Sequence, residues 1–278
     1  MVFSSLIFLF VFLTANLIVY FAVSPKNRNK TLLIFSLVFY AWGGPRYLLL
    51  LAGETLVSWL FAIKIDESRA GYTKRSEKFY LVCDLVIMLG CLAIFKYLGF
   101  FLGNIKGIFG VPKVVPEIVL PIGISFYTFQ STGYMIDVYR GVADAERNPL
   151  RYALFVSFFP QLVQGPISRW NDLKKSLLES HAFSWINIQY GFERILWGYF
   201  KKMVIADRAA IGLATIQSDV SVYYGAYAFV GMLLYAIDLY ADFTGGIDIT
   251  IGVAQMFGFT LPENFRRPFF SKSIAEYW

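Results

Sequence analysis

Three carboxylates stand close together in an apolar stretch near the end of the sequence, YAIDLYADFTGGIDITIGVAQMFGFTLPENF. They belong to Asp238, Asp242 and Asp248, and the adjacent glycines Gly245 and Gly246 separate the last two. Carboxylates can line an ion path, orient a catalytic imidazole or take part in proton transfer. Which of these chemistries applies depends on the solvent that surrounds them.

Two interpretations of these aspartates are open. In the structural one, the two glycines break a helix, Asp242 and Asp248 lie at the resulting helix ends, and Thr244 or Asp248 caps the next helix. In the functional one, a carboxylate at bilayer depth faces a cavity, because an ionised group there is costly unless it is paired or hydrated. We favour the structural interpretation for Asp238 and Asp248 and the functional one for Asp242.

Composition identifies the surrounding solvent as lipid. Of 278 residues, 57% are hydrophobic and 16% are charged, whereas soluble domains carry about 25% charged residues. Apolar runs of roughly 17 to 25 residues can cross a bilayer. Such runs occupy residues 3–23, 79–102, 118–136, 186–206 and 220–240, and shorter or interrupted runs occupy 31–42, 47–63 and 152–163. The sequence therefore predicts an all-α, multi-pass transmembrane helical bundle without internal repeats.

Two stretches carry polar residues and prolines that are unusual for membrane sequence. In LPIGISFYTFQSTGYMIDVYRG, Gln130 and several hydroxyls fall at bilayer depth, where they need internal partners or a wet cavity. In FVSFFPQLVQGPISRW, Pro160 and Pro166 remove backbone donors, and Gln161 and Gln164 offer replacements. We therefore expect broken and re-entrant helices here, buried in protein and away from lipid.

Basic residues predict the orientation. Lys26, Arg28 and Lys30 follow the first apolar run and nothing positive precedes it, while the loop 64–78 is a second basic cluster. Both loops are expected in the cytoplasm, with the N-terminus outside and an outer reversal at WGGPRY. The first run lacks a basic residue before it and a cleavage site after it, so we expect it to be retained. The net charge of +6 then reflects cytoplasmic loops and lipid headgroups and not nucleic-acid binding.

The motifs of soluble enzymes are absent from the sequence. It contains no phosphate loop, no dinucleotide fingerprint and no paired cysteines or histidines for zinc, so no bound cofactor or metal is expected. The single histidine, His181, lies in the polar stretch SLLESHAFSW and is interpreted as a loop or helix-end residue. Cys83 and Cys91, eight positions apart on one predicted helix, are roughly 12 Å apart and beyond disulfide reach.

Several strings, in their order and spacing, resemble the membrane-bound O-acyltransferase family, and within it the bacterial alginate O-acetyltransferase and D-alanyl-lipoteichoic acid transfer group. They are MVFSSLIFLF, FYAWG, FKYLGFF, PIGISFYTFQ, DVYRG, FFPQLVQGPISR, FKKMVIAD, LYADFTGGIDITIG and ENFRRPFFSKSIAEYW. The resemblance implies a many-helix funnel. In it, a histidine at mid-membrane helps to move an acyl group from a cytoplasmic donor to an acceptor beyond the membrane.

The sequence also departs from the family pattern. Family members continue after a segment like EYW into a basic pair, a tryptophan and a histidine, with a second histidine further on, whereas this sequence stops at Trp278. We therefore expect residues 1–278 to form a single transmembrane domain, truncated before the catalytic histidine segments, and the chain alone to be inactive. Gly246 stands where relatives usually have a tyrosine, which puts any role of that tyrosine in doubt here.

The resemblance implies where site residues and partners should be sought. No catalytic residue is expected within this chain, and the candidates for the substrate channel or its supporting groups are Asp242, Gln130, Gln161, Gln164 and Asn264. Asp242 would orient a catalytic histidine by fixing its tautomer. The implied acyl donor is acyl-CoA or an acyl-carrier thioester, and the implied partners are the bilayer, a carrier protein and a periplasmic or extracellular acyltransferase. The implied location is the bacterial inner or plasma membrane.

Two basic sites have milder interpretations. Lys96 lies near the end of its apolar run and can snorkel to the interface. Arg266 and Arg267 are expected on a cytoplasmic or headgroup surface, or against the phosphopantetheine of a donor or an acidic carrier protein.

Two other classes of function remain open from the sequence. A transporter or channel also requires broken helices and carboxylates at mid-membrane, although the inverted repeats that would support it are absent. A non-catalytic membrane scaffold that binds a partner enzyme is the third possibility. The coding sequence after Trp278 separates the enzyme from the scaffold.

Overall fold

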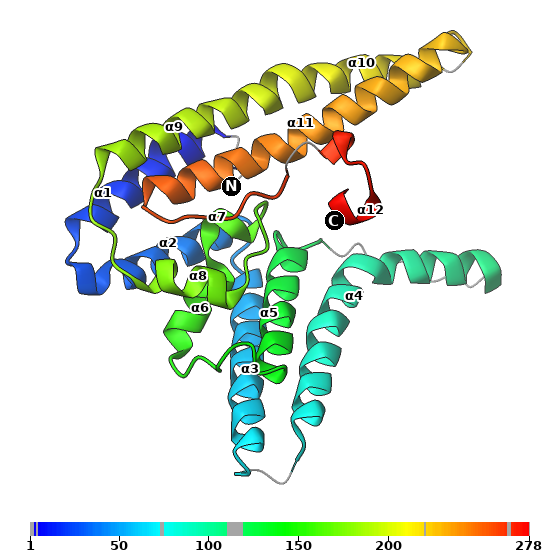
Figure 1. Cartoon of the computed structure of the whole chain (residues 1–278). Helices are drawn as coiled ribbons and strands as arrows, with labels where there is room; N and C mark the ends of the chain where they lie inside the picture. Colours follow the sequence, from blue (N-terminus) through cyan, green and yellow to red (C-terminus); the bar gives the residue numbers. More distant parts are fainter. Residues whose placement is uncertain are drawn as a thin grey trace. The chain divides into compact units, whose positions relative to one another are not determined.

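The computed structural model describes residues 3, 5–72, 75–109, 119–219, 221–265 and 268–277. Within these ranges the chain forms helices and connecting loops and contains no strand, which confirms the predicted all-α class (Figure 1). The chain folds as two compact units. The first comprises Ile18–Val163 and Ile167–Ser180, and the second comprises Val2–Leu17, Gln164–Pro166 and His181–Trp278. The single transmembrane domain inferred from the sequence stays a prediction, because one domain can contain two such units.

The first unit is built around three helices that pack on one another. They are α3 (Tyr47–Arg69), α4 (Glu77–Phe109) and α5 (Ile124–Tyr139). Further helices are α2 (Arg28–Trp42), α6 (Pro149–Ser157), α7 (Phe159–Leu162) and α8 (Trp170–Leu178). The core is strongly aromatic: Tyr134 packs against Tyr152 with ring centroids 4.8 Å apart, and Phe155 meets Trp170 at 5.1 Å. Burial of such rings favours association of these helices.

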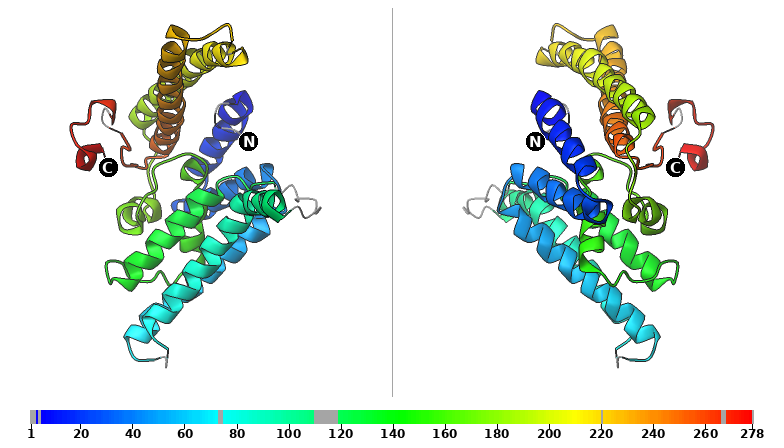
Figure 2. Two further views of the ribbon diagram at one scale, coloured as in Figure 1. Left: turned by 90° about the vertical axis from the view of Figure 1, so that its right-hand side faces the viewer. Right: turned by 90° about the vertical axis from the view of Figure 1, so that its left-hand side faces the viewer.

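The second unit pairs two long helical runs. One run consists of α9 (Trp185–Tyr199), the π-helix η3 (Phe200–Ala206) and α10 (Asp207–Ser218), without interruption between them. The other is α11 (Ala226–Met256), which packs against all three along its length (Figures 1 and 2). The unit also contains η1 (Phe8–Leu13), η4 (Pro268–Phe270) and α12 (Ile274–Tyr277), and α1 (Thr14–Ala22) continues from η1.

Among the residues that the structure describes, three helices are long and apolar enough to cross a membrane: Tyr47–Arg69, Glu77–Ile105 within α4, and Ala226–Met256. The second agrees with the predicted run 79–102. The first is longer than the predicted run 47–63, because the helix continues through the charged residues up to Arg69. The third begins after the start of the predicted run 220–240 and extends well beyond its end. This chain is therefore a membrane protein.

The predicted helix break within 152–163 is confirmed. α6 ends at Ser157, Phe158 adopts φ −53° and ψ 103°, and α7 holds only four residues, with Pro160 near its start. The left-handed Gly123 (φ 73°) just before α5 lies against the carbonyl oxygen of Leu162, where a side chain would not fit. This irregular segment is therefore packed tightly inside the first unit, while its re-entrant path through the bilayer stays a prediction.

Candidate functional site

Glycines let α9 and α11 approach each other at backbone distance. A Cβ atom on Gly198 would lie 2.5 Å from the carbonyl oxygen of Gly245, and a Cβ on Gly252 would lie 2.5 Å from that of Gly191. Each helix presents its two glycines seven positions apart, which is two helical turns and hence one face. The order of the pairs is reversed between the helices, so the helices are antiparallel. Small residues at such spacing are a common device for close packing of membrane helices.

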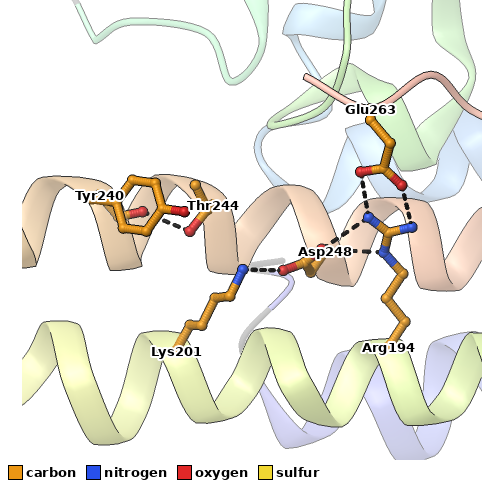
Figure 3. A network of polar contacts seen from close by, with 6 residues as sticks. All are labelled: Arg194, Lys201, Tyr240, Thr244, Asp248 and Glu263. Atoms are coloured by element: carbon orange, nitrogen blue, oxygen red, sulfur yellow. Dashed lines mark hydrogen bonds and ion pairs between the residues drawn. The ribbon is translucent and has the colours of Figure 1, made fainter. Parts of the chain in front are cut away.

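Asp248 stands between the two glycine contacts and binds two cations. Its Oδ1 accepts hydrogen bonds from Nε and Nη2 of Arg194 at 3.1 and 3.0 Å, and its Oδ2 accepts one from Nζ of Lys201 at 2.6 Å (Figure 3). Arg194 also binds Glu263, with both Nη atoms 2.6 Å from separate carboxylate oxygens. Two cations and two carboxylates therefore form one connected network, which is drawn in Figure 3.

The burial of this network explains its composition. Side-chain exposure is 12% for Asp248, 17% for Lys201 and 26% for Arg194, while Glu263 at the rim is 47% exposed. Charges this far from water are tolerated only when they are paired and hydrogen-bonded. The opposite charges balance, so the network places no net charge between the helices. Removing one member would leave an uncompensated charge in a largely buried place.

A second ion pair, beside the Asp248 network, joins η3 to α11. Lys202 donates to Oδ1 of Asp242, whose side chain is 46% exposed. Lys201 and Lys202 follow each other in the π-helix η3, and both reach α11 although consecutive side chains on an α-helix diverge by about 100°. π-Helical turns occur frequently at functional sites. The Asp242 side chain is therefore about as accessible as that of Glu263 and much more accessible than that of Asp248.

Proteins named as acyltransferases of envelope polymers match the chain, the O-acetyltransferases along its whole length and a D-alanyltransferase over part of it. It is 40% identical over 287 residues to a probable alginate O-acetylase of Pseudomonas aeruginosa, a match that covers 100% of this chain and 54% of the relative. It is 31% identical over 315 residues to a peptidoglycan O-acetyltransferase of Helicobacter pylori, covering 100% and 58%. A teichoic acid D-alanyltransferase of Bacillus subtilis is 28% identical over 167 residues, covering 56% and 40%. No family model matches the chain.

The chain belongs to the membrane-bound O-acyltransferase family. It spans about half the length of the curated relatives that it matches along its whole length.

The prediction that Gly245 and Gly246 break a helix is wrong. α11 runs continuously from Ala226 to Met256, so neither Asp242 nor Asp248 lies at a helix end, and Thr244 caps nothing: its hydroxyl donates to the carbonyl of Tyr240 at 2.7 Å. The physical reason is that Gly245 provides close contact with α9, which offsets the low helix propensity of glycine. Asp238 likewise lies within the helix.

Gln164 lies beside the second glycine of the pair. A Cβ atom on Gly246 would overlap the side-chain amide of Gln164, and Thr250 on the same helix donates its hydroxyl to the backbone carbonyl of Gln164. Because Gly246 has no side chain, it leaves the space that the Gln164 amide fills. The prediction that Gln164 supports a channel is not decided by this contact.

The structure also describes the other predicted lining residues, Gln130, Gln161 and Asn264. Gln130 and Gln161 belong to the first unit and are 5% and 2% exposed; Gln130 donates to the carbonyl of Phe155 at 3.0 Å and Gln161 to the hydroxyl of Ser168 at 2.5 Å. Both are thus buried with internal partners, as expected for polar groups at bilayer depth, Gln130 within α5 and Gln161 within the irregular segment. Asn264 is exposed in the loop after α11.

Of the remaining residues considered from the sequence, His181 and Lys96 are described by the structure and are not members of the network. His181 is half-buried in the loop before α9, with its ring 4.8 Å from that of Phe259, so the predicted loop position is confirmed. Lys96 is exposed on α4 and lies over the ring of Tyr97. Arg266 and Arg267 lie outside the described residues.

Sequence reasoning missed the partners Arg194, Lys201, Lys202 and Glu263. A signal was present, because Arg194 and Lys201 interrupt the apolar run 186–206 with the same seven-residue spacing as Gly191 and Gly198. Charges on the glycine face of one helix, opposite aspartates on another glycine-containing helix, predict interhelical ion pairs.

Proposed function

We propose that this chain forms part of a membrane O-acyltransferase that esterifies a hydroxyl of a cell-envelope polysaccharide or of an acyl-carrying partner. The observation that carries the proposal is the match along the whole chain to proteins named as alginate and peptidoglycan O-acetyltransferases. The acyl group is acetyl, in line with those names, and the donor is acyl-CoA or an acyl-carrier thioester in the cytoplasm. The chain requires no bound cofactor for this chemistry.

The reaction exchanges one bond for another. A general base takes the proton of the acceptor hydroxyl, the oxygen attacks the thioester carbonyl, and the thiol leaves with a proton. In the family that this sequence resembles, a histidine serves as the base. The residues of this chain contribute positioning: the glycine contacts and the Asp248 network hold α9 and α11 in one register, and this fixes Asp242 and Lys202 beside each other.

Asp242 is the residue that we place beside the reacting groups. Its carboxylate is about half exposed and is held at one oxygen by Lys202, so the other oxygen can accept a hydrogen bond from an imidazole. Such a bond would fix the tautomer of a catalytic histidine and stabilise its charged form. Asp242 is therefore a positioning residue in this proposal, and Asp248 is structural.

The proposed setting is the plasma membrane of a bacterium, crossed several times, with the N-terminus outside. The loops 26–30 and 64–78 would then face the cytoplasm, where a donor or carrier protein is available. An acyltransferase outside the membrane would receive the acyl group or act with this chain on the polymer.

The experiment is genetic and chemical. Deletion of the gene that encodes this chain should lower the base-labile acetate of one envelope polymer, and re-expression should restore it. A re-expressed Asp242→Asn variant should lose at least about tenfold in turnover, equivalent to about 1.4 kcal/mol of barrier, at unchanged protein level in the membrane. Unchanged ester content in the exopolysaccharide, peptidoglycan and teichoic acid fractions of the deletion strain would contradict the proposed function.

A further inference from the structure

The first unit contains a buried polar cluster that the proposed acyl transfer does not use. Polar side chains from five helices, α2 to α6, are buried together in its interior. They are Tyr40, Glu54, Ser58, Asp84, Tyr127, Thr128, Ser131 and Tyr152, and each is at most 5% exposed. Such a concentration is unusual in helices that lie in lipid, where ionisable residues generally mark ion paths or proton relays.

Two of these residues are carboxylic acids on helices long enough to span the membrane. Glu54 on α3 is 4% exposed and Asp84 on α4 is 0% exposed. Within the described part of the chain, neither forms an ion pair with a lysine, arginine or histidine. The basic residues of α3 bind other acids instead: Lys64 binds Glu67, and Arg69 binds Glu77.

Hydroxyl groups surround the two carboxylic acids. Ser58 lies next to Asp84 and accepts a hydrogen bond from the Tyr152 hydroxyl at 3.0 Å, while Tyr127 lies next to Glu54. None of the four carboxyl oxygens forms a hydrogen bond of ordinary length and angle with the described residues. The acids therefore retain unused acceptor capacity, and the nearby oxygens are ligands of the kind that hard cations prefer.

Free energy limits the states that this arrangement can adopt. An ionised carboxylate at this depth, without a partner, costs several kcal/mol, so each acid must either hold a proton or share a metal cation. Glu54 and Asp84 also act on each other electrostatically, so the charge of one affects the cation affinity of the other.

We propose that Glu54 and Asp84 form a buried binding site for an exchangeable monovalent cation, H⁺ or Na⁺, lined by the hydroxyls of Ser58, Tyr127 and Tyr152. The groups that face this site are Tyr40 on α2, Ser58 on α3, Cys91 on α4, Tyr127 and Ser131 on α5, and Tyr152 on α6. The site stands on the contacts of the first unit and does not depend on the proposed acyl transfer.

Carbodiimide labelling tests this without a substitution. Dicyclohexylcarbodiimide modifies protonated carboxyl groups in apolar surroundings, and peptide mass spectrometry locates the adduct. The protonated fraction of a titrating acid falls about tenfold for each pH unit above its pKa. For the full chain in detergent, we expect labelling of Glu54 or Asp84 that falls severalfold between about pH 5 and about pH 9.

A second set of labelling reactions distinguishes binding of Na⁺ from binding of H⁺. At constant pH and ionic strength, replacement of choline chloride by NaCl should decrease labelling severalfold if the site takes Na⁺, and should leave it unchanged if the site takes H⁺ alone. Asp219, which is exposed in the loop after α10, is the matched control acid and should stay unlabelled. Glu54→Gln should abolish the adduct at position 54 and shift the pH at which labelling of Asp84 declines.

Either of two results would overturn the proposal. One is labelling of both Glu54 and Asp84 that depends on neither pH nor Na⁺, and the other is no labelling of either residue. Constant labelling would mean permanently protonated acids that serve only as hydrogen-bonding groups. Absence of labelling would mean that neither acid exchanges a proton in this environment.

Discussion

Gly198 on α9 faces Gly245 on α11 so closely that a single added Cβ atom at position 198 would lie 2.5 Å from the Gly245 carbonyl oxygen. This contact and its counterpart between Gly191 and Gly252 fix both the distance and the register of the two helices. The register places Asp248 between Arg194 and Lys201. Backbone packing and charge pairing in the second unit therefore depend on each other.

The first prediction concerns this glycine contact. Gly198→Ala should lower the free energy of unfolding by about 1 to 3 kcal/mol, because the methyl group can be accommodated only if the helices separate. Thermal unfolding in detergent measures it. The matched control is Gly231→Ala in α11, where a Cβ atom would meet its nearest neighbour at 3.5 Å, an ordinary contact. That variant should be neutral or slightly stabilising, since alanine favours helix. Equal melting temperatures for the two variants would show that the close approach is not needed.

The second prediction ranks the two aspartates by stability. Asp248→Asn should cost about 3 kcal/mol, because Lys201 would lose the carboxylate that it binds and Arg194 would keep only Glu263, in a largely buried place. Asp242→Asn should cost about 0 to 1 kcal/mol, because its ion pair with Lys202 is partly exposed. Thermal or denaturant unfolding of the two variants compares them. The reverse ranking would mean that Asp248 is not the centre of the network.

The third prediction concerns the irregular segment of the first unit. Gln161→Leu should destabilise the protein by about 1 to 3 kcal/mol, because it removes the donor that binds the buried Ser168 hydroxyl. Gln217→Leu provides the control, since Gln217 is exposed on α10. Yield and melting temperature in detergent report the effect. If the two leucine variants behave alike, the hydrogen bond of Gln161 contributes nothing measurable.

The fourth prediction concerns orientation in the membrane. In a variant without Cys83 and Cys91, single cysteines at the exposed positions Asn27 and Tyr72 should be protected from an impermeant thiol reagent added outside intact cells. A cysteine at the exposed Arg46, in the turn between α2 and α3, should react. Permeabilised cells control for accessibility. Reaction at Asn27 or Tyr72 in intact cells would reverse the predicted topology.

Much of the secondary structure of the second unit could be predicted from the sequence, because it depends on residues that are near one another in the chain. The apolar runs 186–206 and 220–240 predicted the helices that the structure forms as α9 with η3 and as the first part of α11, and the polar composition around His181 predicted a loop. In the first unit, Pro160 predicted a broken helix because proline removes a backbone donor wherever it stands. These properties depend on a residue and its near neighbours, so a one-dimensional pattern contains them.

The sequence by itself determined that this protein is a helical membrane protein and that it resembles the O-acyltransferases. Only the tertiary structure decided the role of the Gly245 and Gly246 pair, because glycine is equally suited to a helix break and to a close helix contact, and only a partner helix distinguishes them. It also decided the pairing of Asp248 with Arg194, 54 positions apart in the chain. Such pairing depends on the rotation and register of two packed helices. Those quantities are set by contacts between the helices and are absent from the pattern of either one.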